Sequence, residues 1–352
     1  MITATVKPFY GTTTRGSSLR RLINMEASII TTYRCTNRCQ MCNTWQYPTE
    51  EIDEFRPALL EKLPDLSFCN ITGGEPFLRE DIEEIIGIIM KKARRLVIST
   101  NGYFTERILE VARRKTNIGF RVSIEGLPAV NDELRGMKDS FDHGLRTLLE
   151  LKRIGVKDIG FGVTVSDRNA KDMFELYLLS RFMGVEFATA VTHNSYYFHK
   201  HDNRLEDPEM VAQEFEKLAL VLLKTNKVKD WFRAYFNMGL ANRVRGGQRP
   251  LPCETGRDVF FLDPFGNVLP CNGTDKPAIM GNLKEHTFEE IWISPRADEA
   301  RSLVKKCTKQ CWMIGSASPA MKKQIWVPAN WILHNKLSMI LAKGKDFRLS
   351  PV

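Results

Sequence analysis

Three cysteines lie within eight residues near the start of the chain, at Cys35, Cys39 and Cys42. Thiolates this close together suit an iron–sulfur cluster, because iron in such clusters is held by cysteine sulfur. A [4Fe–4S] cluster has four irons, so three local thiolates leave one iron open to a further ligand. A zinc site is the alternative, although zinc sites usually bring a second cysteine pair or a histidine pair. Neither pair follows closely behind Cys42.

The cysteines follow residues 26–34, an apolar and β-branched stretch that predicts a β-strand. Strand-like and helix-like stretches then alternate, which predicts a parallel sheet with right-handed crossovers. The other expected strands span residues 67–73, 95–100, 118–125, 158–165 and 185–192, and the expected helices span 56–62, 80–93, 105–114, 142–154 and 169–183. In parallel barrels the chemistry lies at the carboxyl ends of the strands, where the cysteine loop leaves the first strand.

The second expected strand is followed by the motif Gly73-Gly74-Glu75-Pro76. Two glycines let the backbone approach a ligand closely, and the proline stiffens the exit from the strand. An ordinary strand-to-helix turn would also use a glycine pair, so the motif gains its meaning from the cysteines that precede it.

The C-x3-C-x2-C spacing after a first strand, with Gly-Gly-Glu-Pro after the second, resembles the radical S-adenosylmethionine (radical SAM) enzymes. The resemblance implies an open, partial (β/α)6 TIM barrel over residues 26–200. It also implies a SAM-binding [4Fe–4S] cluster on the three cysteines and reductive cleavage of SAM to a 5′-deoxyadenosyl radical. The SAM contacts that it implies are Gly73, Gly74, Glu75, Pro76, Ser123, Arg135, Met41 and Asn101, with Glu125 as a weaker candidate.

Met41 departs from the family pattern, because many members carry an aromatic residue before the third cysteine, where it packs near adenine. A thioether also packs on aromatic rings, so adenine binding remains compatible with this sequence.

A second cysteine set comprises Cys253, Cys271, Cys307 and Cys311. Between the first two, residues 259–270 predict a β-hairpin that would bring them together. With a short helix expected at 287–293, this stretch resembles the SPASM/Twitch auxiliary domain of radical SAM enzymes. Four thiolates suffice for one further [4Fe–4S] cluster, and a zinc ribbon is the alternative. The eighth cysteine, Cys69, lies inside the second strand and is expected in the core.

The rest of the chain divides by composition. Residues 1–25 form a lead-in with a short helix expected at 17–24. A helical connector over 201–250 is expected to hold helices at 208–224 and 231–244, the auxiliary domain covers 251–315, and a basic tail covers 316–352. Within the tail, residues 321–345 predict an amphipathic helix that either docks on the barrel or touches an anionic membrane.

The chain of 352 residues has 51 basic and 42 acidic side chains, a net charge of +9. It has no apolar run long enough to span a membrane and no signal-peptide core, which predicts a cytoplasmic location where thiols stay reduced. No nucleic-acid-binding module is visible, so no nucleic-acid partner is expected. The resemblance implies an external reductant such as flavodoxin or ferredoxin.

The resemblance leaves the substrate open. Only 34 residues precede Cys35, fewer than a leader-binding domain needs, which favours a small molecule such as a sugar or aminocyclitol alcohol. The alternatives are a ribosomal peptide presented by a separate leader-binding partner and a lipid or polyprenyl-linked substrate. A plain electron-transfer module would need no SAM motif at residues 73–76. His193, Tyr196 and His199 follow the sixth strand and are candidate substrate contacts or bases.

Overall fold

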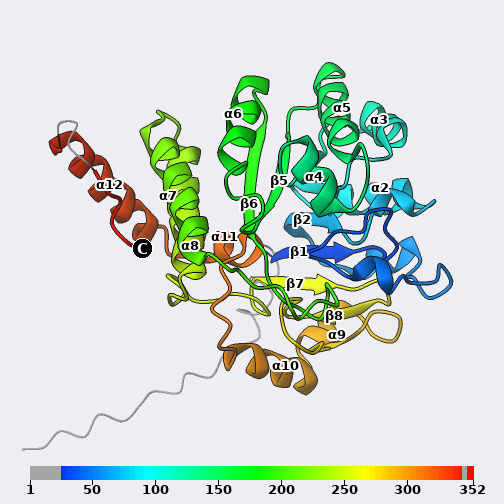
Figure 1. Ribbon diagram of the computed structural model, residues 1–352. Coiled ribbons are helices and arrows are strands. Elements are labelled where there is room, and N and C mark those ends of the chain that lie inside the picture. The colour runs from blue at the N-terminus through cyan, green and yellow to red at the C-terminus, as the bar shows by residue number, and fades with distance from the viewer. Residues whose placement is uncertain (1–24, 343–346) are drawn as a thin grey trace, which may run out of the picture.

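The computed structural model describes residues 25–342 and 347–352 (Figure 1). The lead-in and its expected helix at 17–24 lie outside these residues. Six parallel strands alternate with helices along the first half of the described chain. They are β1 (Met25–Ile30), β2 (Leu66–Thr72), β3 (Leu96–Thr100), β4 (Gly119–Ser123), β5 (Ile159–Val165) and β6 (Glu186–Val191).

The sheet is open and runs in the order β6-β5-β4-β3-β2-β1-β7-β8-β9. The first six strands confirm the expected partial barrel. Strand β7 (Val259–Leu262) pairs in parallel with β1, and an antiparallel pairing joins it to β8 (Asn267–Leu269), which pairs in turn with β9 (Gly281–Asn282). The expected hairpin therefore forms, and it continues the barrel sheet across the outer edge of β1 (Figure 1).

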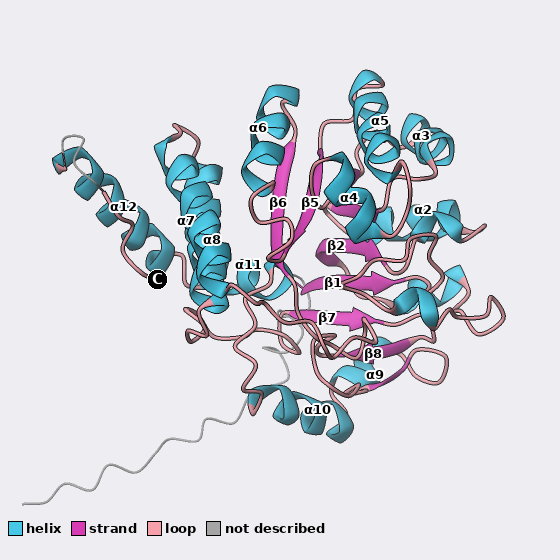
Figure 2. Cartoon of the chain, in the orientation of Figure 1, coloured by secondary structure: helices cyan, strands magenta, loops and turns pink. Residues whose placement is uncertain are grey.

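Helices line one side of the parallel strands (Figure 2). They are α2 (Ile82–Lys92), α3 (Thr105–Arg114), α4 (Pro128–Arg135), α5 (Ser140–Arg153) and α6 (Met173–Met183). Helix α4 was not expected from the sequence. The stretch expected as a helix at 56–62 is instead a 3-10 helix, η2 (Pro57–Lys62), because it begins at a proline and the next proline follows at Pro64. Two shorter 3-10 turns are η1 (Thr44–Gln46) and η3 (Pro76–Leu78).

The connector folds as a helical hairpin of α7 (Pro208–Lys224) and α8 (Val228–Val244). The auxiliary region adds α9 (Phe288–Trp292) and α10 (Pro295–Lys305), of which α10 was not expected. The helix expected in the tail forms with narrower bounds, as α12 (Trp326–Leu341), and a separate helix, α11 (Ile314–Lys323), precedes it. Pro328 lies in the first turn of α12, where its missing N–H removes no helical hydrogen bond.

The core forms between the sheet and its helices, as the apolar periodicity requires. Ile29, Ile71 and Ile98 on three adjacent strands are fully buried. Cys69 is also fully buried in β2, which confirms its expected place in the core. Within residues 25–342 and 347–352, no helix is long and apolar enough to cross a membrane.

Candidate functional site

The cysteine loop leaves the carboxyl end of β1 and is held by the end of helix α4. The Arg38 N–H donates to the Arg135 carbonyl at 3.0 Å, and the Gln40 N–H donates to the Leu134 carbonyl at 2.9 Å. Cys35, Cys39 and Cys42 are each partly buried. The backbone of α4 thus fixes the middle of the loop, where the second cysteine lies.

Glycines at the neighbouring strand ends allow the close approach of the cysteine loop. A Cβ atom at Gly74 would lie 2.1 Å from the Arg34 carbonyl oxygen, and one at Gly73 would lie 2.5 Å from the Thr32 carbonyl oxygen. On the other side, Gly136 has φ of +57°, and a Cβ atom there would lie 2.4 Å from the Arg38 carbonyl oxygen. Any side chain at these positions would push the loop away, so the glycines of the motif shape the cysteine loop itself.

We expect Gly74→Ala to displace the cysteine loop, because the clash is with backbone and has no flexible side chain to relieve it. Cluster iron should fall from about eight to about four per chain. SAM cleavage should drop by about a hundredfold, the order of loss that a misplacement near 1 Å produces. Gly315→Ala is the matched control, since a Cβ atom at Gly315 meets nothing within 4 Å. Equal iron content in both variants would contradict the steric role.

Glu75 and Asn101 tie three strand ends together. The buried Glu75 carboxylate accepts hydrogen bonds from the Thr100 hydroxyl at 2.8 Å and from the Asn101 N–H at 2.7 Å. The Asn101 side-chain amide donates to Thr36 at 2.9 Å and to Asn37 at 2.7 Å, both within the cysteine loop. Both residues were expected as SAM contacts; in the structure the Asn101 side chain holds the cysteine loop, and the Glu75 side chain holds Asn101.

A buried ion pair lies beside the cysteines. Arg135 Nη1 is 2.9 Å from Glu125 Oε1, and both side chains are nearly inaccessible to solvent. Glu125 is held further by the Thr164 N–H at 2.6 Å. Arg135 Nε and Asn37 Nδ2 are buried donors without a partner among the described residues. Unpaired buried donors are costly, so these two mark where an anionic group fits.

The donor set fits an iron–sulfur cluster. In the absence of iron, burial raises the pKa of Cys35 to about 12 and that of Cys39 to about 11, while Arg135 acts to lower both. Metal binding takes up thiolates and releases their protons, so a buried cation beside the thiols favours the bound form. In the part of the chain that the structure describes, no three cysteine, histidine or acidic side chains are close enough for one shared metal ion. A four-iron cluster holds its thiolates further apart than the short Zn–S bonds of a single ion.

The auxiliary cysteines also come together, from segments far apart in the sequence. Burial, together with the nearby thiols of Cys253, Cys311 and Cys307, raises the pKa of Cys271 to about 12. Cys253 and Cys307 are exposed, whereas Cys271 and Cys311 are partly buried. All four thiols are therefore near enough to affect one another's charge, beside the hairpin of β7 and β8.

Arg249 anchors this rim. Its guanidinium donates to the Cys311 carbonyl and, at 2.8 Å, to the Ser316 carbonyl, and it lies 5.1 Å from the ring centroid of Trp312. Lys309, between the last two cysteines, donates to the Gly273 carbonyl at 2.9 Å. These two cations hold the cysteine-bearing segments of the auxiliary region against each other.

The segment that follows β6, residues 192–203, joins the two cysteine sets. Toward the first set, the Asn43 N–H donates to the Phe198 carbonyl at 2.8 Å. Toward the second, the Tyr196 N–H donates to the Thr274 carbonyl at 3.0 Å. The segment therefore lies at the mouth of the barrel, between the two sets of thiols.

The expected catalytic candidates lie on this joining segment, with different surroundings. Thr192 Oγ1, His193 Nδ1 and the Tyr196 hydroxyl are buried without a partner within the described residues. Burial lowers the pKa of His193 to about 4, so its ring is neutral at pH 7. His199 stacks on Tyr47 with ring centroids 4.5 Å apart, which is a packing role.

Sequence reasoning missed Tyr197. Its hydroxyl donates to the Gly73 carbonyl at 2.9 Å, so it joins the segment after β6 to the glycine motif. Nothing in the local sequence separates it from Tyr196, and only the fold distinguishes the two.

The remaining expected SAM contacts lie at the same end of the barrel. Ser123 ends β4 at the same edge of the sheet, Pro76 begins η3, and the Met41 carbonyl accepts from Asn203 at 3.0 Å.

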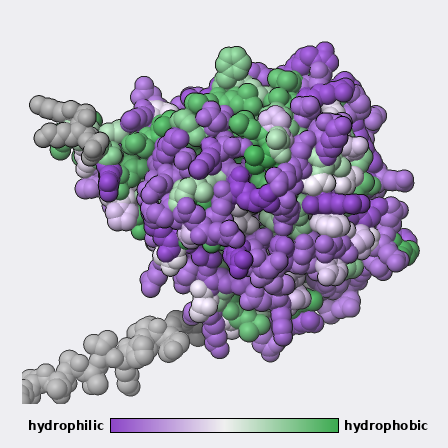
Figure 3. All heavy atoms as spheres, viewed as in Figure 1, coloured by the Kyte–Doolittle hydropathy of each residue, from purple (hydrophilic) through white to green (hydrophobic). Residues whose placement is uncertain are grey.

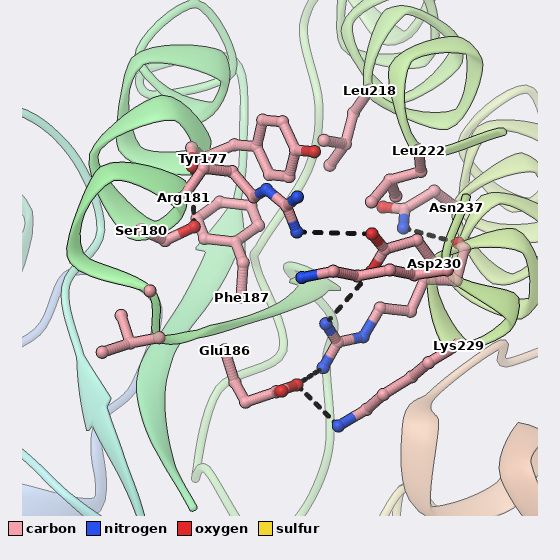
Figure 4. A pocket seen from close by; sticks show the side chains of 14 residues that line it. Tyr177, Ser180, Arg181, Glu186, Phe187, Leu218, Leu222, Lys229, Asp230 and Asn237 are labelled. Atoms are coloured by element: carbon pink, nitrogen blue, oxygen red, sulfur yellow. Dashed lines mark hydrogen bonds and ion pairs between the residues drawn. The ribbon is translucent and has the colours of Figure 1, made fainter. Parts of the chain in front are cut away.

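A separate cavity of about 180 Å³ lies at the opposite end of β6, and none of the cysteines lines it (Figure 4). Its walls carry an ion-pair network in which Asp230 faces Arg181 at 3.3 Å and Glu186 faces Lys229 at 2.8 Å. The charges are paired with one another across α6, β6 and α8. This cavity therefore joins the helical hairpin to the barrel at the end away from the cysteines.

Fold and site together define an iron–sulfur enzyme built on an open parallel barrel. The chain matches the radical SAM superfamily over residues 29–178 and an iron–sulfur cluster-binding domain, SPASM, over residues 253–312. It is 33% identical over 293 residues to Fe-coproporphyrin III synthase of Methanosarcina barkeri, covering 74% of this chain and 71% of that protein. The chain therefore belongs to the radical SAM superfamily, and its cofactors are [4Fe–4S] clusters and SAM.

Two further comparisons widen the range of relatives. The chain is 26% identical over 283 residues to mycofactocin maturase MftC of Mycolicibacterium smegmatis, covering 74% of this chain and 68% of that protein. Its fold resembles that of Streptococcus suis SuiB bound to the precursor peptide SuiA, with a TM-score of 0.57 at 17% identity, covering 86% of this chain and 73% of SuiB. The fold is thus shared by enzymes with very different substrates.

Proposed function

We propose that this enzyme removes a hydrogen atom from a small, hydroxyl-bearing organic molecule, with Cys35, Cys39 and Cys42 holding the SAM-binding cluster and Cys253, Cys271, Cys307 and Cys311 holding one auxiliary cluster. When bound, these groups would supply the electron that cleaves SAM, the 5′-deoxyadenosyl radical, and an acceptor for the electron that the substrate gives up. An external reductant such as flavodoxin or ferredoxin would supply the first electron.

The observation that carries the proposal is the position of buried, unpartnered polar atoms between the two cysteine sets. Beside the first set, Arg135 Nε and Asn37 Nδ2 are placed to bind the SAM carboxylate. Glu125 holds the Arg135 guanidinium in that orientation through the 2.9 Å ion pair. The Gly73 and Gly74 backbone would let the methionine end of SAM lie close to the cysteine loop.

The substrate assignment depends on the segment after β6. Thr192, His193 and Tyr196 present two hydroxyls and one imidazole nitrogen, His193 Nδ1, without partners among the described residues, and such groups pair with the hydroxyls of a polar molecule. A neutral imidazole can also accept the proton that a substrate radical releases on oxidation. The relative that is 33% identical to this chain, Fe-coproporphyrin III synthase, is also named after a small molecule.

Measurement of 5′-deoxyadenosine tests this proposal. The protein, reconstituted without oxygen, should hold about eight irons and eight sulfides per chain. Formation of 5′-deoxyadenosine should rise several-fold when a protease-treated, low-mass metabolite fraction from the source cells is added. Deuterium from the labelled substrate should appear in the 5′-deoxyadenosine.

A peptide substrate is the second candidate, favoured by the fold shared with SuiB, whose structure holds a precursor peptide. In that case the stimulating fraction would lose its effect on protease treatment. Stimulation that survives protease but extracts into organic solvent would point instead to a lipid-linked substrate. Either result would overturn the small-molecule assignment and leave the SAM chemistry in place.

A further inference from the structure

Helix α12 is apolar on two sides, and the residues that the structure describes cover only one of them. On its inner side, Trp331 packs edge-on against Tyr235 of α8, with ring centroids 5.6 Å apart. The final residues of the chain cover the same side, where the Trp331 and Asn335 side chains donate to Ser350 at 2.9 and 2.7 Å. The helix is therefore already docked through Trp331, Ile332 and Asn335, and its outer side is not needed for that packing.

The outer side carries a stripe of large apolar side chains, which we call the outer stripe. Its spacings of seven, four and three residues place the first four members on one face of a helix. Each member is between 51% and 78% exposed. Hydrophobic atoms are visible on the surface at the α12 end of the molecule in Figure 3. The members are Trp326, Leu333, Leu337, Ile340 and Leu341. Exposed apolar side chains gathered in this way mark an interaction surface.

The surroundings of the outer stripe are basic. Lys336 of α12 lies 3.9 Å from the ring centroid of Trp231 and donates to the Thr225 carbonyl at 3.4 Å, so α12 contacts the turn between α7 and α8. That turn, residues 224–229, holds three lysines and no acidic residue, with Val228 57% exposed. Residues 314–342 of the tail likewise contain no aspartate or glutamate.

We propose that the outer stripe and the turn at 224–229 form a docking surface for an anionic membrane. An amphipathic helix binds an interface through apolar side chains that enter the acyl boundary, supported by nearby lysines that face anionic headgroups. Trp326 at the start of the stripe suits the headgroup level. The proposal is independent of the reaction that the barrel performs.

A second copy of the chain fits this surface less well. A two-fold interface sets each patch against the same patch of the partner copy, so it would bring Lys224 and Lys227 close to their counterparts. Like charges at an interface oppose association, whereas a membrane of anionic lipid complements them. The charge distribution therefore selects a lipid surface.

Vesicle flotation of the reconstituted full-length protein tests the proposal. The protein should float with mixed phosphatidylcholine–phosphatidylglycerol vesicles and much less with phosphatidylcholine alone. Combined Leu333→Asn, Leu337→Asn and Ile340→Asn should weaken binding at least about tenfold, since three apolar side chains lose their insertion. Combined Lys224→Glu and Lys227→Glu should lower binding to the anionic vesicles several-fold and leave binding to neutral vesicles unchanged.

Phe182→Asn is the matched control, because Phe182 is 91% exposed on α6 and lies outside the outer stripe. It should float like the unaltered protein. Unchanged melting temperatures would show that the variants fold. Flotation of the stripe variant equal to that of the unaltered protein would overturn the proposal. So would failure of the unaltered protein to float, or a dimer in sedimentation that the stripe variant abolishes.

Discussion

Replacement of Cys35, Cys39 and Cys42 together by alanine is expected to reduce 5′-deoxyadenosine formation to background. The three thiols are the only cysteines on the loop that α4, the glycine motif and Asn101 hold in place. Without them no other described thiol at that edge of the sheet can bind iron, because Cys69 is enclosed in β2. The variant should keep about four irons per chain, those of the auxiliary site.

Cys69→Ala is the control for this prediction. It removes a fully buried thiol and should cost about 1 kcal/mol of stability through the small cavity that it leaves. Its iron content and its 5′-deoxyadenosine formation should match those of the unaltered protein. Persistent SAM cleavage in the triple variant would disprove the assignment of the cluster to this loop.

Cys271→Ala combined with Cys311→Ala is expected to separate SAM cleavage from formation of the oxidised product. These are the two partly buried thiols of the auxiliary set, so their loss should empty the auxiliary site and again leave about four irons. Cleavage of SAM should continue within about twofold, since α4, the glycine motif and Asn101, which hold the first cysteine loop, all belong to the barrel. Formation of the oxidised product should fall below detection, because the substrate radical then has no electron acceptor.

The readouts for this second prediction are iron content, 5′-deoxyadenosine and product, measured in one sample. Arg181→Lys provides a matched control, because Arg181 lines the distant cavity and contacts neither cysteine set. It should leave the ratio of product to 5′-deoxyadenosine unchanged. A double cysteine variant that forms product at the normal ratio would show that the auxiliary site takes no part in electron transfer.

The barrel and its motifs could be predicted from the sequence because these depend on local patterns. Alternating strands and helices, the cysteine spacing and Gly73-Gly74 can each be recognised within a few residues. Helix α4 was not predicted because its apolar face is short, although its end at Gly136 supports the cysteine loop. The hairpin over 259–270 was expected, whereas its pairing with β1 joins residues too distant for any local pattern to reveal.

The site was predictable in its residue types and less so in its contacts. Glu75 stood out as part of the Gly-Gly-Glu-Pro motif and Asn101 as a polar residue at a strand end. The partners of Glu75 lie at the end of β3 and those of Asn101 in the cysteine loop, so they appear only when the strands are side by side. Tyr197 was passed over for Tyr196, since adjacent residues on an irregular segment have no period to show which one faces the glycine motif. In the tail, α12 begins just before Pro328. A proline can stand in the first turn of a helix or end the helix before it, and the local sequence does not show which of the two applies.

The pairing of β7 with β1 has a consequence for synthesis of the chain on the ribosome. Until residues 259–262 emerge, the six-stranded sheet must hold the outer edge of β1 unpaired, with backbone groups free to join another chain. Completion of the auxiliary region closes that edge with Glu26 opposite Val259. The strand that carries the reactive loop is thus protected only after most of the protein has been made, and nascent chains need shelter for that interval.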